Sequence, residues 1–203
     1  MRPTPRQIDK AKEIFRHHGG MLRTAEVIRE GIQPRVLYAM RDAGEVTMLR
    51  RGCYRLAELD QMAEPDLAVV AKAAPKGVIC LVSALSFHDI TTQIPRAVDL
   101  ALPAHTHSPK IEYPPIQPYW FSGQAYSAGV ETHDIDGVRV RIYSPAKTVA
   151  DCFKYRKKIG KDVAMEALRF CRDRKGTSVA EFLEFARICR VQNIMSPYLE
   201  AML

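Results

Sequence analysis

The first 60 residues hold three short helical patterns, each ended by glycine, followed by two short strand patterns. The apolar spacing predicts helices over 5–18, 25–30 and 34–43, which stop at Gly19-Gly20, Gly31 and Gly44. Residues 46–56 then predict two strands that meet near Arg50-Arg51-Gly52. Three helices and a hairpin in this order are typical of a winged helix-turn-helix, and this order limits the possible folds more than any other feature.

The third predicted helix would present an apolar face to the core and a polar face to solvent. At 100° per residue, Val36, Leu37 and Met40 share one face. If that face packs inward, the side chains that project toward a DNA major groove are Gln33, Arg35, Tyr38 and Arg41. Asp42 lies on the same outer face, which is unfavourable for a surface that meets DNA.

Further candidate DNA contacts lie outside the third helix. Arg23 and Thr24 stand at the start of the second predicted helix, where Thr24 is the expected cap and where a phosphate could be bound. Arg50 and Arg51 stand at the hairpin tip and could reach a phosphate or the minor groove. The alternative interpretation is a protein interaction module whose surface arginines are merely solvated.

The rest of the chain predicts an α+β arrangement. Residues 66–75 indicate a helix after a polar connector at 57–65, strands are expected over 97–103 and 119–122, and a hairpin is expected around Asp136-Gly137. Helices follow from Ser144-Pro145, over 163–172 and 179–189, and from Pro197. Residues 78–82 are compatible with a buried strand or with the start of a helix over 83–88. We therefore predict a winged-helix domain over residues 1–60 and an α+β domain, a mixed sheet followed by helices, over residues 61–203.

Charge is concentrated at the two ends of the chain. Residues 1–60 contain 12 Lys/Arg and 8 Asp/Glu, residues 61–143 contain 6 and 8, and residues 144–203 contain 12 and 7. Cations clustered in this way favour binding to a polyanion, and the alternative is a solvated basic surface. The basic stretch 154–158, with Tyr155 among four cations, fits backbone binding as well as it fits a solvated helix end.

The compartment follows from what the sequence lacks. No apolar run approaches the ~18 residues of a membrane span, and the N-terminus has no signal-peptide pattern, so we expect a cytoplasmic protein with no membrane contact. The five cysteines, Cys53, Cys80, Cys152, Cys171 and Cys189, are scattered and odd in number, which predicts reduced, buried thiols.

Three motifs contain residue types that could form reactive sites. Asp134-Ile135-Asp136 has the spacing of a metal-binding carboxylate pair, but Asp136-Gly137 is a stronger hairpin signal. The histidines of His105-Thr106-His107 lie between prolines without a third ligand, and Ser83, Ser86 and His88 have no nucleophile elbow around them. We expect no catalytic residue, no metal and no cofactor.

Several segments together resemble the AbiEi antitoxins of abortive-infection toxin–antitoxin systems. They are RGCYRL at 51–56, SALSFH at 83–88 with Ile94-Pro95, IYSPAKTVADCF at 142–153, KYRKKIG at 154–160 and VAMEAL at 163–168. Each motif is weak by itself, whereas their order and spacing over nearly the whole chain are specific. Cys53 stands where valine or isoleucine is more usual in the hairpin.

The resemblance implies a bacterial regulator of a type IV system used in phage defence. Its winged helix would bind inverted repeats of double-stranded DNA in its own promoter and repress the operon. The C-terminal domain would counter a nucleotidyltransferase toxin without forming a stable complex. The protein would be a monomer or a weak dimer in solution, and its copies could bind DNA cooperatively. A basic face of both domains would map onto Arg23, Arg35, Arg41, Arg50 and Arg51, and onto Lys147, Arg156, Lys157 and Lys158.

Two other function classes stay open at this stage. The first is a nucleic-acid-processing enzyme that a winged helix brings to its substrate, for which Asp134 and Asp136 are the candidate metal ligands. The second is a pure interaction module that binds an acidic protein.

Overall fold

The computed structural model describes residues 3–18, 20–57, 65–135 and 137–201. The chain divides into two compact units, Met1–Pro65 with Asp134–Val138 and Asp66–His133 with Arg139–Leu203. Most of the predicted connector and the boundary near residue 60 fall outside the described residues, so the exact domain limits stay a prediction.

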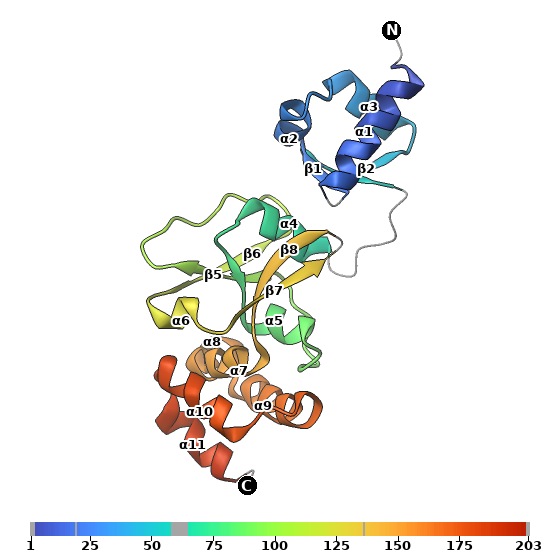
Figure 1. The fold of residues 1–203 in the computed structure, drawn as a ribbon. Helices are drawn as coiled ribbons and strands as arrows, with labels where there is room; N and C mark the ends of the chain where they lie inside the picture. The colour runs from blue at the N-terminus through green and yellow to red at the C-terminus, as the bar shows by residue number, and fades with distance from the viewer. Residues whose placement is uncertain (1–2, 19, 58–64, 136, 202–203) are drawn as a thin grey trace. The chain divides into compact units, whose positions relative to one another are not determined.

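The first unit has the predicted helices and hairpin. Its elements are α1 (Pro5–His17), β1 (Met21–Arg23), α2 (Thr24–Arg29), α3 (Pro34–Asp42), β2 (Val46–Arg50) and β3 (Cys53–Leu56) (Figure 1). β1 was not expected, because three residues carry no periodicity. It becomes a strand by pairing antiparallel with β3, which gives a sheet of order β1-β3-β2. This arrangement confirms the winged helix-turn-helix fold.

Local sequence explains where these helices begin. Thr4 precedes Pro5, and its backbone N–H donates to Oε1 of Gln7 at 2.9 Å. α2 begins at Thr24 itself rather than after it, and the backbone N–H of Arg23 donates to Oε2 of Glu26 at 2.7 Å. Each bond satisfies a donor that the helix leaves free. Below them, a separate core forms around Phe15, Leu22, Val27, Leu37 and Leu56.

The second unit is an α+β structure with a mixed sheet. Its elements are α4 (Pro65–Ala73), β4 (Val78–Ile79), α5 (Leu81–Phe87), β5 (Val98–Pro103), β6 (Ile116–Phe121), α6 (Gln124–Ser127), β7 (Val130–Ile135), β8 (Val138–Tyr143), α7 (Pro145–Lys154), α8 (Arg156–Ile159), α9 (Lys161–Lys175), α10 (Val179–Ile188) and α11 (Gln192–Glu200). The sheet order is β6-β5-β4-β8-β7, with β4 antiparallel to β5 and parallel to β8, and with β5 parallel to β6.

The undecided stretch 78–82 forms both elements in turn. Val78 and Ile79 pair with β5 and Ile79 with β8, and the chain then enters α5 at Leu81. The helix start is held from a neighbouring strand, because Oδ2 of Asp99 accepts from the backbone N–H groups of Val82 at 3.0 Å and Ser83 at 3.4 Å. A contact across 16 or 17 residues of sequence cannot be seen in local periodicity.

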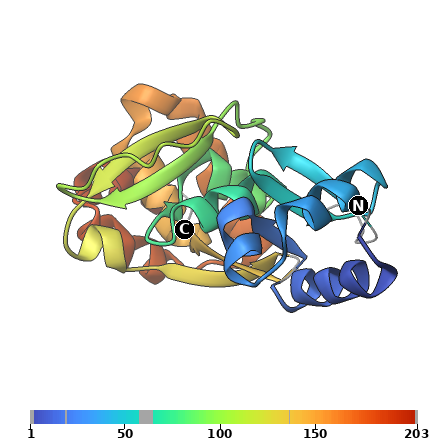
Figure 2. The same cartoon turned by 90° about the horizontal axis from the view of Figure 1, so that it is seen from above.

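The C-terminal helices bury the largest core of the molecule. α7 is buried from Ala146 to Phe153 and contacts α5, α9, α10 and α11. Figure 1 shows these helices gathered at one end of the sheet, and in Figure 2 the orange and red helices lie behind its strands. The predicted start at Pro197 was wrong, because Val191 already accepts from the N–H groups of Ile194 and Met195 and α11 begins one turn earlier.

Candidate nucleic-acid interface

α3 has the two faces that its sequence predicts. Val36, Leu37 and Met40 are buried, whereas Gln33, Arg35, Tyr38 and Arg41 are exposed. Gln33 precedes the first helical residue, Pro34, so it stands at the N-terminal end of the helix, two residues before Arg35. The second helix of a helix-turn-helix reads bases with residues near its N-terminus. The exposed face of α3 therefore carries the polar residues that the sequence predicts for it.

The start of α2 and the tip of the hairpin lie side by side. The backbone N–H of Thr24 donates to the carbonyl of Gly52 at 2.9 Å, and Arg23 pairs with Cys53 across β1 and β3. Gly52 has φ +75°, and a Cβ on it would lie 3.4 Å from Oγ1 of Thr24. Glycine thus permits the turn through its positive φ, whereas a Cβ would make only an ordinary van der Waals contact with α2. Arg23, Thr24 and Arg51 are brought together by these bonds, while the side chain of Arg50 lies outside the described part of the chain.

The same bonds change how α2 can meet a phosphate. The N–H groups of Arg23 and Thr24 already donate within the protein. A phosphate at this position would therefore meet the Thr24 hydroxyl and the guanidinium of Arg23 rather than these two backbone groups.

Asp42 restrains one of the predicted base-reading residues. Oδ1 of Asp42 accepts from Nε of Arg41 at 2.9 Å and from Nη2 at 2.7 Å, and this hydrogen bond raises the pKa of the Arg41 guanidinium. The same guanidinium lies 5.3 Å from the ring centre of Tyr38. Arg41 is thus already bound to a carboxylate, in contrast to a guanidinium that is free to bind a guanine.

The first unit also exposes large apolar side chains, two of which its sequence does not indicate as exposed. Ile28 on α2 is 52% exposed and Met48 on β2 is 47% exposed, similar to Tyr38 at 44%. Their signal was weak, because an apolar residue in a short helix or strand is usually assigned to the core.

In the second unit, the structure contradicts the prediction that Lys147 is part of an exposed basic surface. Its side chain is 0% exposed, and Nζ lies 2.5 Å from Oδ2 of Asp151, which is also 0% exposed. The ammonium lies 4.0 Å from the ring centre of Tyr143 and 5.1 Å from that of Phe121. A buried ammonium needs this carboxylate and these rings because it has lost its hydration. The Lys147-to-Asp151 spacing of four residues within an apolar helix was the sequence signal for the pair.

The other three predicted basic residues stand at the surface. Lys157 and Lys158 are exposed, and Nζ of Lys158 lies 5.5 Å from the ring centre of Tyr119. Arg156 is half-buried, and its Nη1 donates to the carbonyl of Phe153 at 2.9 Å. These three residues remain candidates for an anionic partner, with Arg156 the least free.

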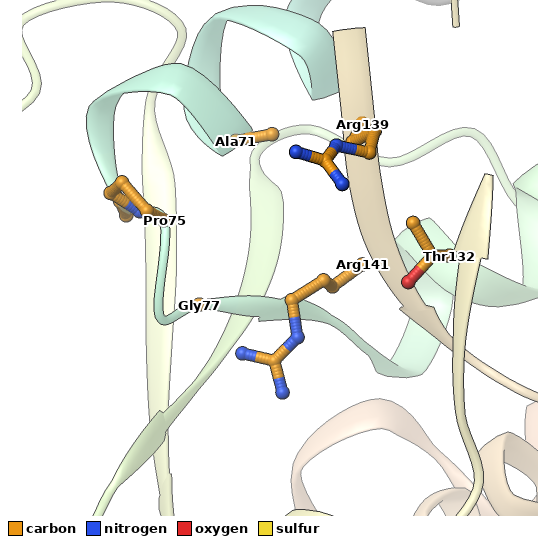
Figure 3. A pocket seen from close by; sticks show the side chains of 7 residues that line it. Ala71, Pro75, Gly77, Thr132, Arg139 and Arg141 are labelled. Carbon is orange, nitrogen blue, oxygen red and sulfur yellow. The ribbon is translucent and has the colours of Figure 1, made fainter. Parts of the chain in front are cut away.

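A cavity of about 320 Å³ lies between α4 and the outer strands (Figure 3). The guanidinium groups of Arg139 and Arg141 project into it from β8, with Thr132 on the neighbouring strand. Nη1 of Arg141 donates to the carbonyl of Lys76 at 3.1 Å, just beyond the end of α4. Arg141 therefore ties the strand to the residues just after α4, and the strand pattern around these two arginines indicates no site in the sequence.

The structure shows the contacts and exposure of the residues in the three motifs that could form reactive sites. Oδ1 of Asp134 accepts from the N–H of Gly137 at 2.7 Å in the predicted hairpin, whereas Asp136 lies outside the described residues. Nε2 of His88 lies 2.8 Å from the carbonyl of Tyr143, and burial lowers the pKa of this imidazole. His105 and His107 are exposed in a loop. Within the described ranges, no three His, Cys, Asp or Glu side chains are grouped to hold a metal.

The cysteines are buried thiols, as predicted. Burial raises the pKa of Cys80 and Cys152 well above the usual range and raises that of Cys189 to about 12. Such groups stay protonated and are poor nucleophiles. Among the described residues, no helix is long and apolar enough to cross a membrane.

Comparisons with known proteins agree with this geometry. The fold resembles the crystal structure of the RV2827C protein from Mycobacterium tuberculosis, with a TM-score of 0.60 and 12% sequence identity over 91% of this chain and 72% of that one. No curated protein matches the sequence. Residues 9–57, which include α2, α3 and the hairpin, match the family model described as transcriptional regulator, AbiEi antitoxin. Over this N-terminal segment the chain is therefore similar to the AbiEi-antitoxin family of transcriptional regulators.

Proposed function

We propose that this protein represses its own operon by binding inverted repeats in the promoter, and that it also counters a nucleotidyltransferase toxin. The observation that carries the first part is the exposed polar and basic face of α3 inside a winged-helix unit of a regulator family. The second part rests on the resemblance of the motifs in residues 83–168 to AbiEi antitoxins.

The residues of the first unit divide into two roles on DNA. In the major groove, Arg35 binds guanine through both guanidinium donors, Gln33 binds adenine, and Tyr38 contacts a thymine methyl group or the backbone. Arg23, Thr24 and Arg51 bind phosphates beside the groove, with Arg50 at the same hairpin tip. Base contacts select the sequence, and phosphate contacts fix the position of the protein on the duplex.

Arg41 has a smaller role in this proposal. To bind a base it must first leave the carboxylate of Asp42, and that exchange offsets part of the gain. Asp42 itself repels the phosphates on either side of the groove.

Inverted repeats require two copies of the protein related by a two-fold axis. Each copy would bind one half-site, with the half-site centres separated by about 10–10.5 base pairs or a multiple of that number. A monomer or weak dimer in solution that assembles on the operator is consistent with this arrangement.

The second unit would act on the toxin system without catalysis and without a cofactor. Its exposed cations Lys157 and Lys158, with Arg156 beside them, are the remaining part of the basic surface implied by the resemblance. The protein acts in the cytoplasm in this proposal, because the promoter it binds is there.

The decisive experiment compares binding of the full chain to the DNA upstream of its own start codon and to a scrambled duplex, across a salt series. We expect a preference of ~10³ or more and a steep loss of affinity with salt. Equal and weak binding to both duplexes would contradict autorepression.

Antitoxin activity is tested separately by expressing the protein with the nucleotidyltransferase gene of its operon. Growth should be restored, while purification of either protein should not retain the other. A stable complex would contradict neutralisation without contact, and failure to restore growth would remove the antitoxin role.

A further inference from the structure

The second unit contains a polar cavity of about 360 Å³ that the proposed function does not use. Three separate parts of the chain line it: the segment that follows β6 into α6, the end of α7, and the end of α10 with the turn after it. The lining residues that carry the argument are Ser122, Gln124, Lys154, Arg187 and Arg190.

Three of these residues are cations that face the same space. Lys154 ends α7, Arg187 lies in the last turn of α10, and Arg190 follows that helix. No carboxylate of the described residues forms an ion pair with any of the three. The C-terminal ends of α7 and α10 each contribute about half a negative charge, which offsets about one of the three positive charges. The cavity therefore keeps a net positive charge.

A buried hydrogen bond fixes the two helices that carry these cations. Sγ of Cys189, at the end of α10, donates to Oδ1 of Asp151 in α7 at 3.2 Å, and the other carboxylate oxygen of Asp151 binds Lys147. Lys154 lies one turn beyond Asp151, and Arg190 directly follows Cys189. The spacing of the cations is thus set by the core before any ligand binds, which lowers the entropy lost on binding.

The backbone at Arg190 gives a second indication that its side chain matters. Arg190 has φ +59°, a left-handed conformation in which α10 ends, with its N–H bonded to the carbonyl of Arg187 at 3.0 Å. Glycine is the usual residue at this position of a helix end because a Cβ is unfavourable there. The chain nevertheless carries an arginine that lines the cavity.

We propose that this cavity binds a compact anion with two or more linked phosphate groups. Its volume lies in the range of small-molecule sites, and its cations converge from the ends of two helices instead of following a line, as they would along a nucleic-acid backbone. Arg187 and Arg190 can each bind phosphate oxygens through two donors, Lys154 adds a point charge, and Ser122 and Gln124 supply hydrogen bonds. The diphosphate can be inorganic or part of a nucleotide.

Calorimetric titration of the full chain with inorganic pyrophosphate tests the proposal, with orthophosphate and a nucleoside diphosphate as separate arms. We expect saturable binding of one pyrophosphate per chain and much weaker binding of orthophosphate. Equal affinity for pyrophosphate and the nucleotide would identify the phosphate groups as the recognised part, and tighter nucleotide binding would add a contact to the base or sugar.

Arg190→Gly is the informative variant because glycine suits the left-handed backbone, so the fold is retained while the cation is lost. It should weaken pyrophosphate binding about 10- to 100-fold, as expected for a charge-assisted hydrogen bond. Arg169→Gln, which removes an exposed charge from α9 outside the cavity, is the matched control and should bind within about twofold of the wild type.

Three results would overturn the proposal. They are the absence of saturable binding to the wild type, Arg190→Gly binding as tightly as the wild type, and an equal loss in Arg169→Gln. Displacement of pyrophosphate by unrelated duplex DNA, with both variants weakened alike, would instead assign these cations to a nucleic-acid surface.

Discussion

The ammonium of Lys147 and the carboxylate of Asp151 are both fully buried, and neither can exchange its partner for water. Burial raises the pKa of Asp151, while Lys147 and Cys189 oppose this effect. We predict that Lys147→Met lowers the free energy of unfolding by about 3–5 kcal/mol, because the carboxylate is left without its cation. Urea denaturation at pH 7 measures the change.

The controls for this prediction separate charge from packing. The double variant Lys147→Met/Asp151→Leu should recover most of the lost stability, because apolar residues of similar volume can replace a buried ion pair. Lys157→Met, at an exposed position, should change stability by less than about 0.5 kcal/mol. If Lys147→Met were as stable as the wild type, the pair would not hold α7 in the core.

Asp99 gives the molecule a pH-dependent stability. Burial raises the pKa of this carboxyl to about 6, although its hydrogen bonds from Ser83 and Val82 act in the opposite direction. The folded state therefore holds the proton more tightly than the unfolded state, and stability falls as pH rises from about 4 to above 6. A shift of about two pKa units corresponds to about 3 kcal/mol.

The variant Asp99→Asn isolates this effect because it cannot ionise. We expect the difference in unfolding free energy between wild type and variant to change by up to about 3 kcal/mol between pH 4 and pH 7, in favour of the variant at the higher pH. Urea denaturation at several pH values measures it. A difference that stays constant with pH would show that Asp99 ionises normally in the folded state.

At the scale of elements, α3 and the hairpin that joins β2 to β3 should contribute to DNA binding in different ways. Arg35→Ala removes a base contact in α3, which should cost about 1–3 kcal/mol on the operator and relax its sequence preference. Arg51→Ala removes a phosphate contact at the hairpin tip, which should weaken all duplexes alike and lower the salt slope by about 1. Fluorescence anisotropy with operator and scrambled duplexes distinguishes the two patterns.

Arg169→Ala, in α9 of the second unit, is the reference for loss of one surface charge. If Arg35→Ala and Arg51→Ala both bound the operator as the wild type does, the proposed orientation of α3 in the groove would be wrong. If both variants only lowered the salt slope, α3 would contact the backbone and not the bases.

At the scale of the whole molecule, the two units have separate cores and should unfold separately. Leu37 belongs to the core of the first unit and Phe182 to that of the second. We predict two calorimetric transitions for the full chain, with Leu37→Ala lowering one and Phe182→Ala lowering the other, each by about 2–5 kcal/mol in stability. A single transition lowered by both variants would mean that the units unfold as one.

Features that depend on near neighbours along the chain could be predicted from the amino-acid sequence. The glycine stops, the proline and threonine at the start of α1, and the buried side of α3 all follow from residues within one or two helical turns, so the winged helix and its polar face could be predicted. The same holds for the strand alternation in β8 and the cap at Ser144, whose hydroxyl oxygen accepts from the N–H of Lys147 at 3.5 Å.

Features that depend on contacts between distant segments became visible in the folded structure, among them which side chains are exposed and can bind a partner. β1 exists because β3 pairs with it, and α5 starts where Asp99 from another strand binds it. Lys147 is buried because α5, α9, α10 and α11 pack against α7. The cavity lined by Lys154, Arg187 and Arg190 is likewise formed by segments that are far apart in the sequence. Burial and electrostatic partners depend on distances in space, and local periodicity does not contain that information.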